Sequence, residues 1–246
     1  MDFVIGADGC RLASGSIDAW AAVELRAGGT ALAHVFRSTR ELWDYARRAR
    51  RVLLDVPIGL PERGPRACDV LARKLLGPRA ASVFPAPERW MLTCETIAQA
   101  DAAKSARAGR ATKVQRQMWN LMPRIRAVDA LLTSDPLARD TIAECHPELC
   151  WRALNAGVPL ARSKHTPTGL ADRRRLIRAA IPDARALERT LLETPGVAPD
   201  DALDALACAW ASAGASAGAA AGDLVSLPDP PERDAAGLRM RMMLRA

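Results

Sequence analysis

The spacing of apolar and polar positions in the first sixty residues predicts three strands, a helix and a fourth strand. Apolar runs lie at residues 3–6, 19–25 and 31–36, and Asp8-Gly9 and Gly28-Gly29 supply turn signals around them. Ser38 and Thr39 then offer an N-cap to a helix with an apolar face. A short apolar run at residues 52–56, stopped by Pro57, is typical of a buried strand. The chain therefore begins β-β-β-α-β.

Helical periodicity dominates the remainder of the chain. Helices are predicted at residues 67–76, 93–108, 114–132, 148–155, 168–181, 183–193 and 200–214, and the small-residue stretch 205–221 is also predicted as helical. An extended segment at 82–89 and a short strand at 141–144 interrupt them, and a proline-rich loop is predicted at 228–232 before a Met/Arg ending. Because strands are spread through the chain, we expect one α/β domain over residues 1–246, with a helical insertion at about 86–138.

Length and composition exclude several classes of protein. The chain has 246 residues, of which 49% are apolar and 26% charged, which is enough to build a large core and argues against disorder. It has no uncharged apolar run of about eighteen residues, so we expect no transmembrane helix and no membrane partner. Asp2 and Asp8 stand where a signal peptide has its basic and apolar regions, so secretion is not expected.

The formal net charge of +7 has two interpretations. A basic excess is typical of proteins that bind nucleic acid. However, only four of the 35 basic residues are lysines, and an Arg- and Ala-rich composition also arises from genomic base composition. Charge alone leaves both interpretations open.

Six cysteines, Cys10, Cys68, Cys94, Cys145, Cys150 and Cys208, occur without any CxxC pair or zinc-finger histidine spacing. A structural zinc site is therefore not expected, and buried free thiols are the favoured interpretation. Scattered cysteines of this kind suit a reducing cytoplasm.

Carboxylates recur at the ends of the predicted strands. Asp8 follows the first apolar run, Asp55 ends the run at 52–56, and Glu144 ends the strand at 141–144. Asp201 and Asp204 are three residues apart and share one face of a late helix. Taken singly, these residues also have ordinary explanations: a turn aspartate at Asp8, an N-cap at Asp201 and a helix-dipole partner at Asp204.

The convergence of these acids is more informative than any one of them. Carboxylates gathered at one sheet edge repel each other unless a cation neutralises them. Oxygen ligands suit Mg²⁺ or Mn²⁺, and two such ions can activate water and stabilise the leaving oxygen of a phosphodiester. The pattern thus predicts a metal-dependent site for phosphodiester hydrolysis.

Seven segments of the chain together form a recognisable pattern: GADGC at Gly6, LDVPIGLP at Leu54, CD at Cys68, SVFPAP at Ser82, QMWNLMPRIRAVDALL at Gln117, ECHPELCW at Glu144 and DDALDALACAW at Asp200. In these segments the chain resembles the bacterial DUF429 family, described as predicted nucleases of ribonuclease H-like fold, and its late acidic helix is similar to that of Holliday-junction resolvases of the RuvC type. The resemblance implies a ribonuclease H-like mixed sheet flanked by helices. It also implies that Asp8, Asp55 and Asp204 are the core metal ligands, with Glu144 and Asp201 as further ligands or supporting acids.

Four other residues are candidates for substrate handling. His146, beside Pro147, is a candidate general acid or phosphate contact, or a cap of the following helix. Arg124 and Arg126 are candidates for phosphate contact if their segment lines the cleft, and Lys164 for a phosphate or an acidic partner. The ordinary alternative for Lys164 is a solvated loop lysine.

The expected function is a divalent-metal-dependent nuclease that hydrolyses RNA or DNA in the cytoplasm. The alternative is a non-catalytic module of the same fold that binds nucleic acid or protein. A nucleotide-dependent phosphotransferase is disfavoured because it needs two glycine-rich phosphate loops, and Gly28-Gly29 lies in a hairpin turn.

Overall fold

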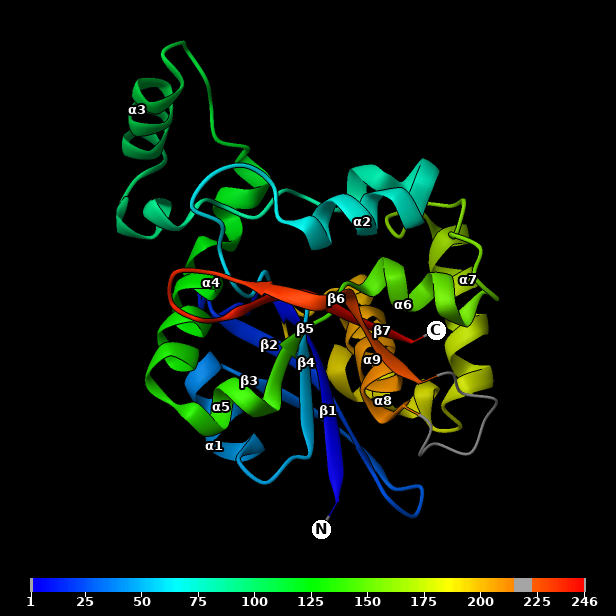
Figure 1. Cartoon of the computed structure of the whole chain (residues 1–246). Helices are drawn as coiled ribbons and strands as arrows, with labels where there is room; N and C mark the ends of the chain where they lie inside the picture. The colour runs from blue at the N-terminus through cyan, green and yellow to red at the C-terminus, as the bar shows by residue number, and fades with distance from the viewer. Residues whose placement is uncertain (1, 215–222, 246) are drawn as a thin grey trace.

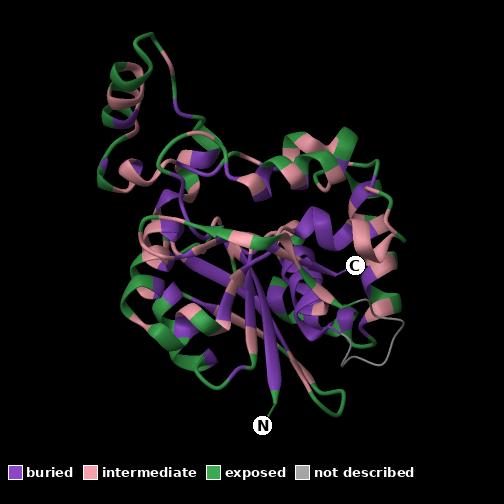
Figure 2. Cartoon of the chain, viewed as in Figure 1, coloured by how far each residue is buried: buried purple, intermediate pink, exposed green. Residues whose placement is uncertain are grey.

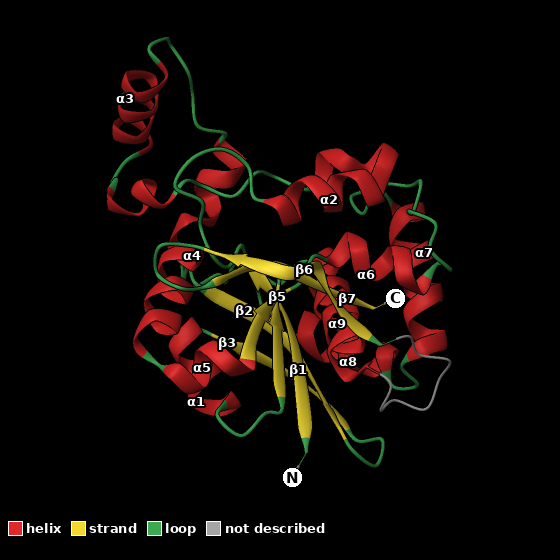
Figure 3. Cartoon of the chain, viewed as in Figure 1, coloured by secondary structure: helices red, strands yellow, loops and turns green. Residues whose placement is uncertain are grey.

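A five-stranded mixed sheet forms the centre of the computed structural model, which describes residues 2–214 and 223–245 (Figures 1 and 3). Its strands are β1 (Phe3–Cys10), β2 (Ala19–Arg26), β3 (Ala31–Phe36), β4 (Arg51–Leu54) and β5 (Ile142–Glu144). The strand order is β3-β2-β1-β4-β5; β2 is antiparallel to its neighbours β1 and β3, and β4 and β5 run parallel to β1. This arrangement agrees with a ribonuclease H-like fold, so the predicted fold class is confirmed.

Helices cover both faces of the sheet (Figure 1). They are α1 (Thr39–Ala46), α2 (Ala67–Leu76), α3 (Ile97–Ala108), α4 (Arg116–Ser134), α5 (Pro136–Thr141), α6 (Pro147–Leu154), α7 (Pro167–Ala180), α8 (Ala184–Leu192) and α9 (Pro199–Ala213), with 3-10 turns η1 (Gly77–Ser82) and η2 (Arg89–Thr93). Strand alternation divides the core: Val52 and Leu54 pack in one cluster with α1, α4 and α5, while Leu53 packs in the other with α7, α8 and α9.

Helix α9 lies against the middle of β1, which is buried along nearly its whole length (Figure 2). The contact is made through Gly6, where an added Cβ would stand 1.8 Å from the backbone nitrogen of Ala209. Only glycine allows the helix backbone to approach the strand this closely. The contact brings Asp201 and Asp204, near the start of α9, towards Asp8 in the second half of β1.

The parallel strands β1, β4 and β5 end at one edge of the sheet. Beyond the end of β4, the backbone nitrogen of Asp55 donates to the carbonyl of Ala7, and that of Cys145 donates to Leu54, each at 3.0 Å. Asp8 lies inside β1 rather than at its end, because the strand continues to pair with β2 as far as Cys10. This hydrogen bonding fixes the backbones of Asp8, Asp55 and Glu144 next to one another.

The C-terminal segment differs from its prediction. The expected proline-rich loop at 228–232 forms part of strand β6 (Leu224–Arg233), which pairs with β7 (Arg239–Arg245) in a separate two-stranded sheet. The prolines coincide with an interruption of the pairing register between Leu227 and Glu232, where a missing N–H is tolerated. Met240 and Met242 alternate with arginines along β7, and their burial stabilises the hairpin.

The expected helical insertion at 86–138 contains η2, α3 and α4 and the start of α5. Helix α4 packs directly on the sheet, whereas α3 stands at the margin of the molecule and buries only Ala100 (Figure 1). Helix α9 ends at Ala213, and residues 215–221 of the small-residue stretch predicted as helical lie outside the described residues. Within the described ranges, no helix combines the length and apolar character needed to cross a bilayer.

A candidate active site at the carboxyl edge of the sheet

A cavity of about 470 Å³ opens where β1, β4 and β5 end and α9 begins. The lining includes eight of the nine residues that the sequence singled out: Asp8, Asp55, Glu144, His146, Lys164, Asp201, Asp204 and Arg124. These residues come from strands, helices and the loops between them, so the fold brings together positions up to about two hundred residues apart in the chain.

Asp8 and Asp55 form the floor of the cavity. Asp8 is 6% exposed, and its Oδ1 accepts a hydrogen bond of 2.8 Å from the backbone nitrogen of Gly9. Burial, followed by the charge of Asp55, raises the pKa of Asp8 well above its ordinary value, and burial also raises the pKa of Asp55. Ionisation of both carboxyl groups is therefore unfavourable when no cation neutralises them.

Asp204 faces this pair from α9 and is held by both of its oxygens. Oδ1 accepts a 2.7 Å hydrogen bond from the indole nitrogen of Trp151, and Oδ2 accepts one of 2.6 Å from Nζ of Lys164. Asp204 is 1% exposed, so its negative charge depends on these two donors.

Lys164 supplies a positive charge to the carboxyl groups of Asp8, Asp55 and Asp204, which together are called the acidic centre. It lies in the loop between α6 and α7, with Nζ also 3.6 Å from the carboxylate of Asp200. Burial opposes its charge, but the carboxylates of Asp204, Asp8 and Asp55 outweigh burial and raise the pKa of Lys164 above its ordinary value. The ammonium group is therefore fully charged at neutral pH. The alternative of a solvated loop lysine does not describe it.

Asp201 lies one helical turn before Asp204. Its Oδ2 accepts a hydrogen bond of 3.2 Å from the backbone nitrogen of Ala198. Ala198 is the N-cap of α9 and Asp201 is at the third helical position, so the alternative that Asp201 is the N-cap is wrong. Burial raises the pKa of Asp201 to about 6. This carboxyl group thus changes protonation near neutral pH, in contrast to a surface aspartate.

Glu144 lines the cavity but is already engaged by other groups. Its two oxygens accept hydrogen bonds of 2.6 and 2.8 Å from the guanidinium of Arg66, and Oε2 accepts another of 2.7 Å from the backbone nitrogen of Ile58. Arg66 also donates to Asp69 at 2.6 Å, and all three side chains are buried. The arrangement is a buried ion-pair network that ties β5 to the segment leading into α2. Sequence analysis missed Arg66 and Asp69; their i, i+3 spacing at the start of a helix is the signal that could have indicated a pair.

His146 and Arg124 both line the cavity, from different elements. His146 caps α6, with its Nδ1 accepting from the backbone nitrogen of Glu148 at 3.2 Å, which leaves the proton on Nε2, 3.3 Å from the carbonyl of Ser82. The guanidinium of Arg124 donates to the carbonyls of Cys10 and Ala19 and is 7% exposed. Arg124 is thereby fixed beside the end of β1.

Arg126 is not part of this lining. Its guanidinium donates to the carbonyls of Leu92 and Cys94, and the side chain lines a different cavity. In its place the structure brings Arg79 to the cavity, where Arg79 donates to Glu148 at 3.2 Å and remains 23% exposed. Glu148 is held more closely by Arg173, at 2.6 Å.

The donor set fits a hard divalent cation in its chemistry but not in its spacing. Asp8, Asp55 and Asp204 offer oxygen ligands from three separate elements, as Mg²⁺ and Mn²⁺ prefer. Within the described residues, the group of three possible ligand side chains that lie within 4.8 Å of one another consists of cysteines rather than these acids. The ion pair with Lys164 also occupies an oxygen of Asp204 that a cation would use.

Fold and site together define a mixed α/β protein of ribonuclease H-like topology with an acid-lined cavity at the carboxyl edge of its sheet. The chain belongs to the DUF429 family, described as protein of unknown function, whose model matches residues 6–233. The match includes every residue of the cavity discussed above. No curated protein and no solved structure gives a match.

Proposed function

We propose that this protein is a divalent-metal-dependent hydrolase of phosphodiester bonds in RNA or DNA. The observation that carries the proposal is that Asp8, Asp55 and Asp204 line one cavity from three separate elements, and that desolvation raises the pKa of the Asp8 and Asp55 pair. Such a pair destabilises the protein when both groups are ionised, and a bound Mg²⁺ or Mn²⁺ relieves the repulsion.

Asp8 and Asp55 would hold the metal, with Asp204 as the third ligand once Lys164 releases it. When bound, the metal supplies Lewis-acid activation of water and of the phosphoryl oxygen. Glu144 is not assigned as a ligand in this proposal, because Arg66 and Ile58 already use its oxygens. Its role is to position the β5 edge of the cavity.

The basic residues of the lining would bind the phosphate. Arg124 and Arg79 both line the cavity, and Lys164 can exchange Asp204 for a phosphate oxygen at little cost in charge pairing. Asp201, with a pKa of about 6, is ionised at neutral pH and is suited to accept a proton from water.

Calorimetric titration with Mg²⁺ or Mn²⁺ at neutral pH tests the metal site directly. Wild-type protein is expected to bind metal in the millimolar range or tighter, and Asp8→Asn and Asp55→Asn to abolish binding. Glu62→Gln, which removes an exposed carboxylate, is the matched control. An absence of binding by wild type at millimolar metal would refute the proposal.

Cleavage of labelled single-stranded RNA, single-stranded DNA, duplex and junction substrates then tests the reaction. Activity must depend on added metal and must disappear in both aspartate variants. Cleavage that survives in Asp8→Asn and Asp55→Asn would come from a contaminant.

A second candidate function is a nucleic-acid-binding module without catalysis. The Lys164–Asp204 ion pair favours it, because the chain already neutralises part of its acidic centre with its own cation. Binding of the same substrates in the presence of a metal chelator distinguishes the two. The binding module should retain full affinity, whereas the hydrolase should bind more weakly and not cleave.

A further inference from the structure

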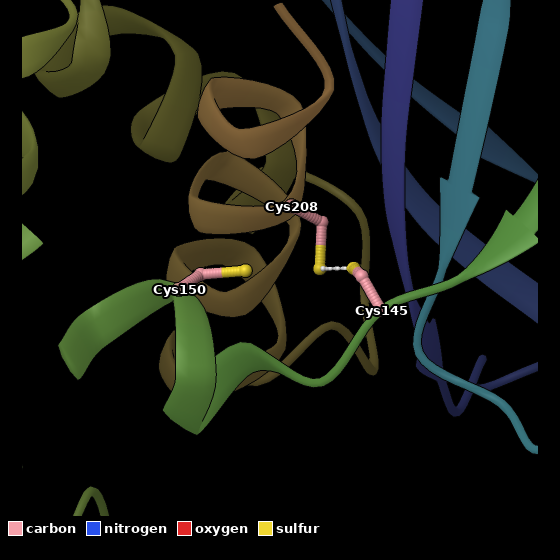
Figure 4. Close-up of side chains that lie close together, drawn as sticks. All are labelled: Cys145, Cys150 and Cys208. Atoms are coloured by element: carbon pink, nitrogen blue, oxygen red, sulfur yellow. Dashed lines mark hydrogen bonds between the residues drawn. The ribbon is translucent and has the colours of Figure 1, made fainter. Parts of the chain in front are cut away.

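Three cysteines converge where the chain after β5 meets helices α6 and α9 (Figure 4). Cys145 follows β5, Cys150 lies in α6 and Cys208 lies in α9, and their sulfur atoms all fall within 4.8 Å of one another. The Sγ atoms of Cys145 and Cys208 are 3.0 Å apart. Segments far apart in the chain thus direct three thiols to a single point.

The surroundings of this cluster are apolar. All three cysteines are fully buried in the core between the sheet and α7, α8 and α9, where Leu53 and Ala205 are among their companions. The other cysteines, Cys10, Cys68 and Cys94, are buried as well but do not join the group. Burial alone therefore does not explain the convergence, and the other buried cysteines supply an internal control.

We propose that Cys145, Cys150 and Cys208 form a binding site for one soft metal ion with three sulfur ligands, and that monovalent copper is the ion it suits. Sulfur ligands select soft ions over Mg²⁺ or Mn²⁺. Metal–thiolate bonds of about 2.3 Å place the sulfurs of a three-coordinate ion about 4 Å apart. The cluster spans this spacing, and the Cys145–Cys208 pair must open by about 1 Å to reach it.

Coordination number favours a monovalent ion. The cluster offers three sulfur ligands, whereas Zn²⁺ in structural sites is almost always bound by four ligands. Thiolate ligands select Cu⁺ among soft ions. Binding changes no oxidation state, and the thiol protons that the metal displaces pass to water.

The site is joined to the acidic cavity by chain neighbours. Cys145 stands between Glu144 and His146, Cys208 lies one turn after Asp204, and Cys150 precedes Trp151, which holds Asp204. An ion at the three sulfurs would fasten the β5–α6 connection to α9. Binding of copper does not depend on the proposed hydrolase activity and can be tested without it.

The test is anaerobic titration of the fully reduced, full-length protein with Cu⁺ in competition with a chromogenic Cu⁺ chelator. Wild type is expected to retain one equivalent and to develop a sulfur-to-copper absorption band in the ultraviolet. Cys150→Ser should weaken retention at least about 100-fold, because it removes a direct ligand. Cys68→Ser and Cys94→Ser, at buried thiols outside the cluster, should match wild type.

Two further measurements keep the result decisive. If Cys150→Ser does not fold, as judged by circular dichroism, Cys208→Ala and Cys145→Ala are compared instead, and protection of wild-type thiols from alkylation by added Cu⁺ is measured. Failure of wild type to retain Cu⁺, or equal retention by the cluster variants, would overturn the site. Tighter binding of Zn²⁺ than of Cu⁺ would overturn the assignment of a monovalent ion.

Discussion

Nζ of Lys164 lies 2.6 Å from Oδ2 of Asp204, in a cavity that Asp8 and Asp55 also line. The lysine comes from a loop, whereas the aspartate comes from a helix packed on the central sheet. The charge balance of the acidic centre therefore depends on a side chain whose backbone does not belong to the sheet or to α9.

Replacement of Lys164 should destabilise the protein when metal is absent. Lys164→Met leaves Asp204 buried with one donor fewer, and the expected loss in the free energy of unfolding is about 1–3 kcal/mol. Added Mg²⁺ should restore most of this loss by neutralising the same carboxylates. Urea denaturation with and without Mg²⁺ measures both effects, and Lys74→Met, at an exposed position of α2, serves as the control. Equal stability of Lys164→Met and wild type in metal-free buffer would contradict the prediction.

Asp201 should give the metal-free protein a stability that falls as pH rises. Its pKa is about 6 in the folded protein and 3.8 as the ordinary value, so the folded state holds the proton more tightly. The stabilising contribution is complete below about pH 4 and is lost as pH increases through about 6. Asp201→Asn cannot ionise, so its stability relative to wild type should increase between about pH 4 and 7. Urea denaturation across that range tests the prediction, and a constant difference would disprove it.

Arg66→Met should be among the most destabilising single substitutions. It leaves Glu144 and Asp69 as buried carboxylates without their shared partner, at an expected cost of about 3–5 kcal/mol. Chemical denaturation measures the loss, and Arg63→Met, at an exposed position nearby in the chain, is the control. A cost no larger than that of the control would show that the network contributes little.

Trp151→Phe should alter the orientation of Asp204 while preserving most of the packing around it. The variant removes the hydrogen bond from the indole nitrogen to Oδ1, at an expected cost of about 1–2 kcal/mol. Metal affinity, measured by calorimetry, should fall because the third ligand is less fixed. Trp43→Phe, which removes a comparable indole hydrogen bond to Asp135 outside the cavity, should leave metal affinity unchanged. A fall of the same size in both variants would contradict the assignment.

Sequence patterns predicted the sheet and much of the site because each relevant residue interrupts an apolar run. Asp55 and Glu144 lie at the ends of buried strands, and Asp204 lies on a helix that is otherwise largely apolar. In the structure the parallel pairing of β1, β4 and β5 brings these acids to one edge of the sheet. The hairpin of β6 and β7 was missed because three prolines in β6 resemble a loop, and an interrupted register accommodates them.

The partners of the acids could not be predicted from the chain in the same way. Arg66 and Glu144 are 78 positions apart, and an arginine in a sequence rich in arginine carries no sign of burial. For Arg126 a signal was available. Residues two apart on a helix point about 200° apart, so Arg124 and Arg126 on α4 are not expected to project side by side into the acidic cavity, although both line a second cavity.

Gly6 bears no side chain, yet it governs how the two halves of the acidic centre meet. Strand β1 and helix α9 touch there backbone to backbone, at a point two residues before Asp8 on the strand. On the helix, the contact falls at Ala209, in the turn that follows Asp204. A larger residue at position 6 would push α9 away from β1 and increase the distance between Asp8 and Asp204 without altering either residue. The geometry of the acidic centre is thus specified in part by an absent side chain, at a position that a search for reactive groups would pass over.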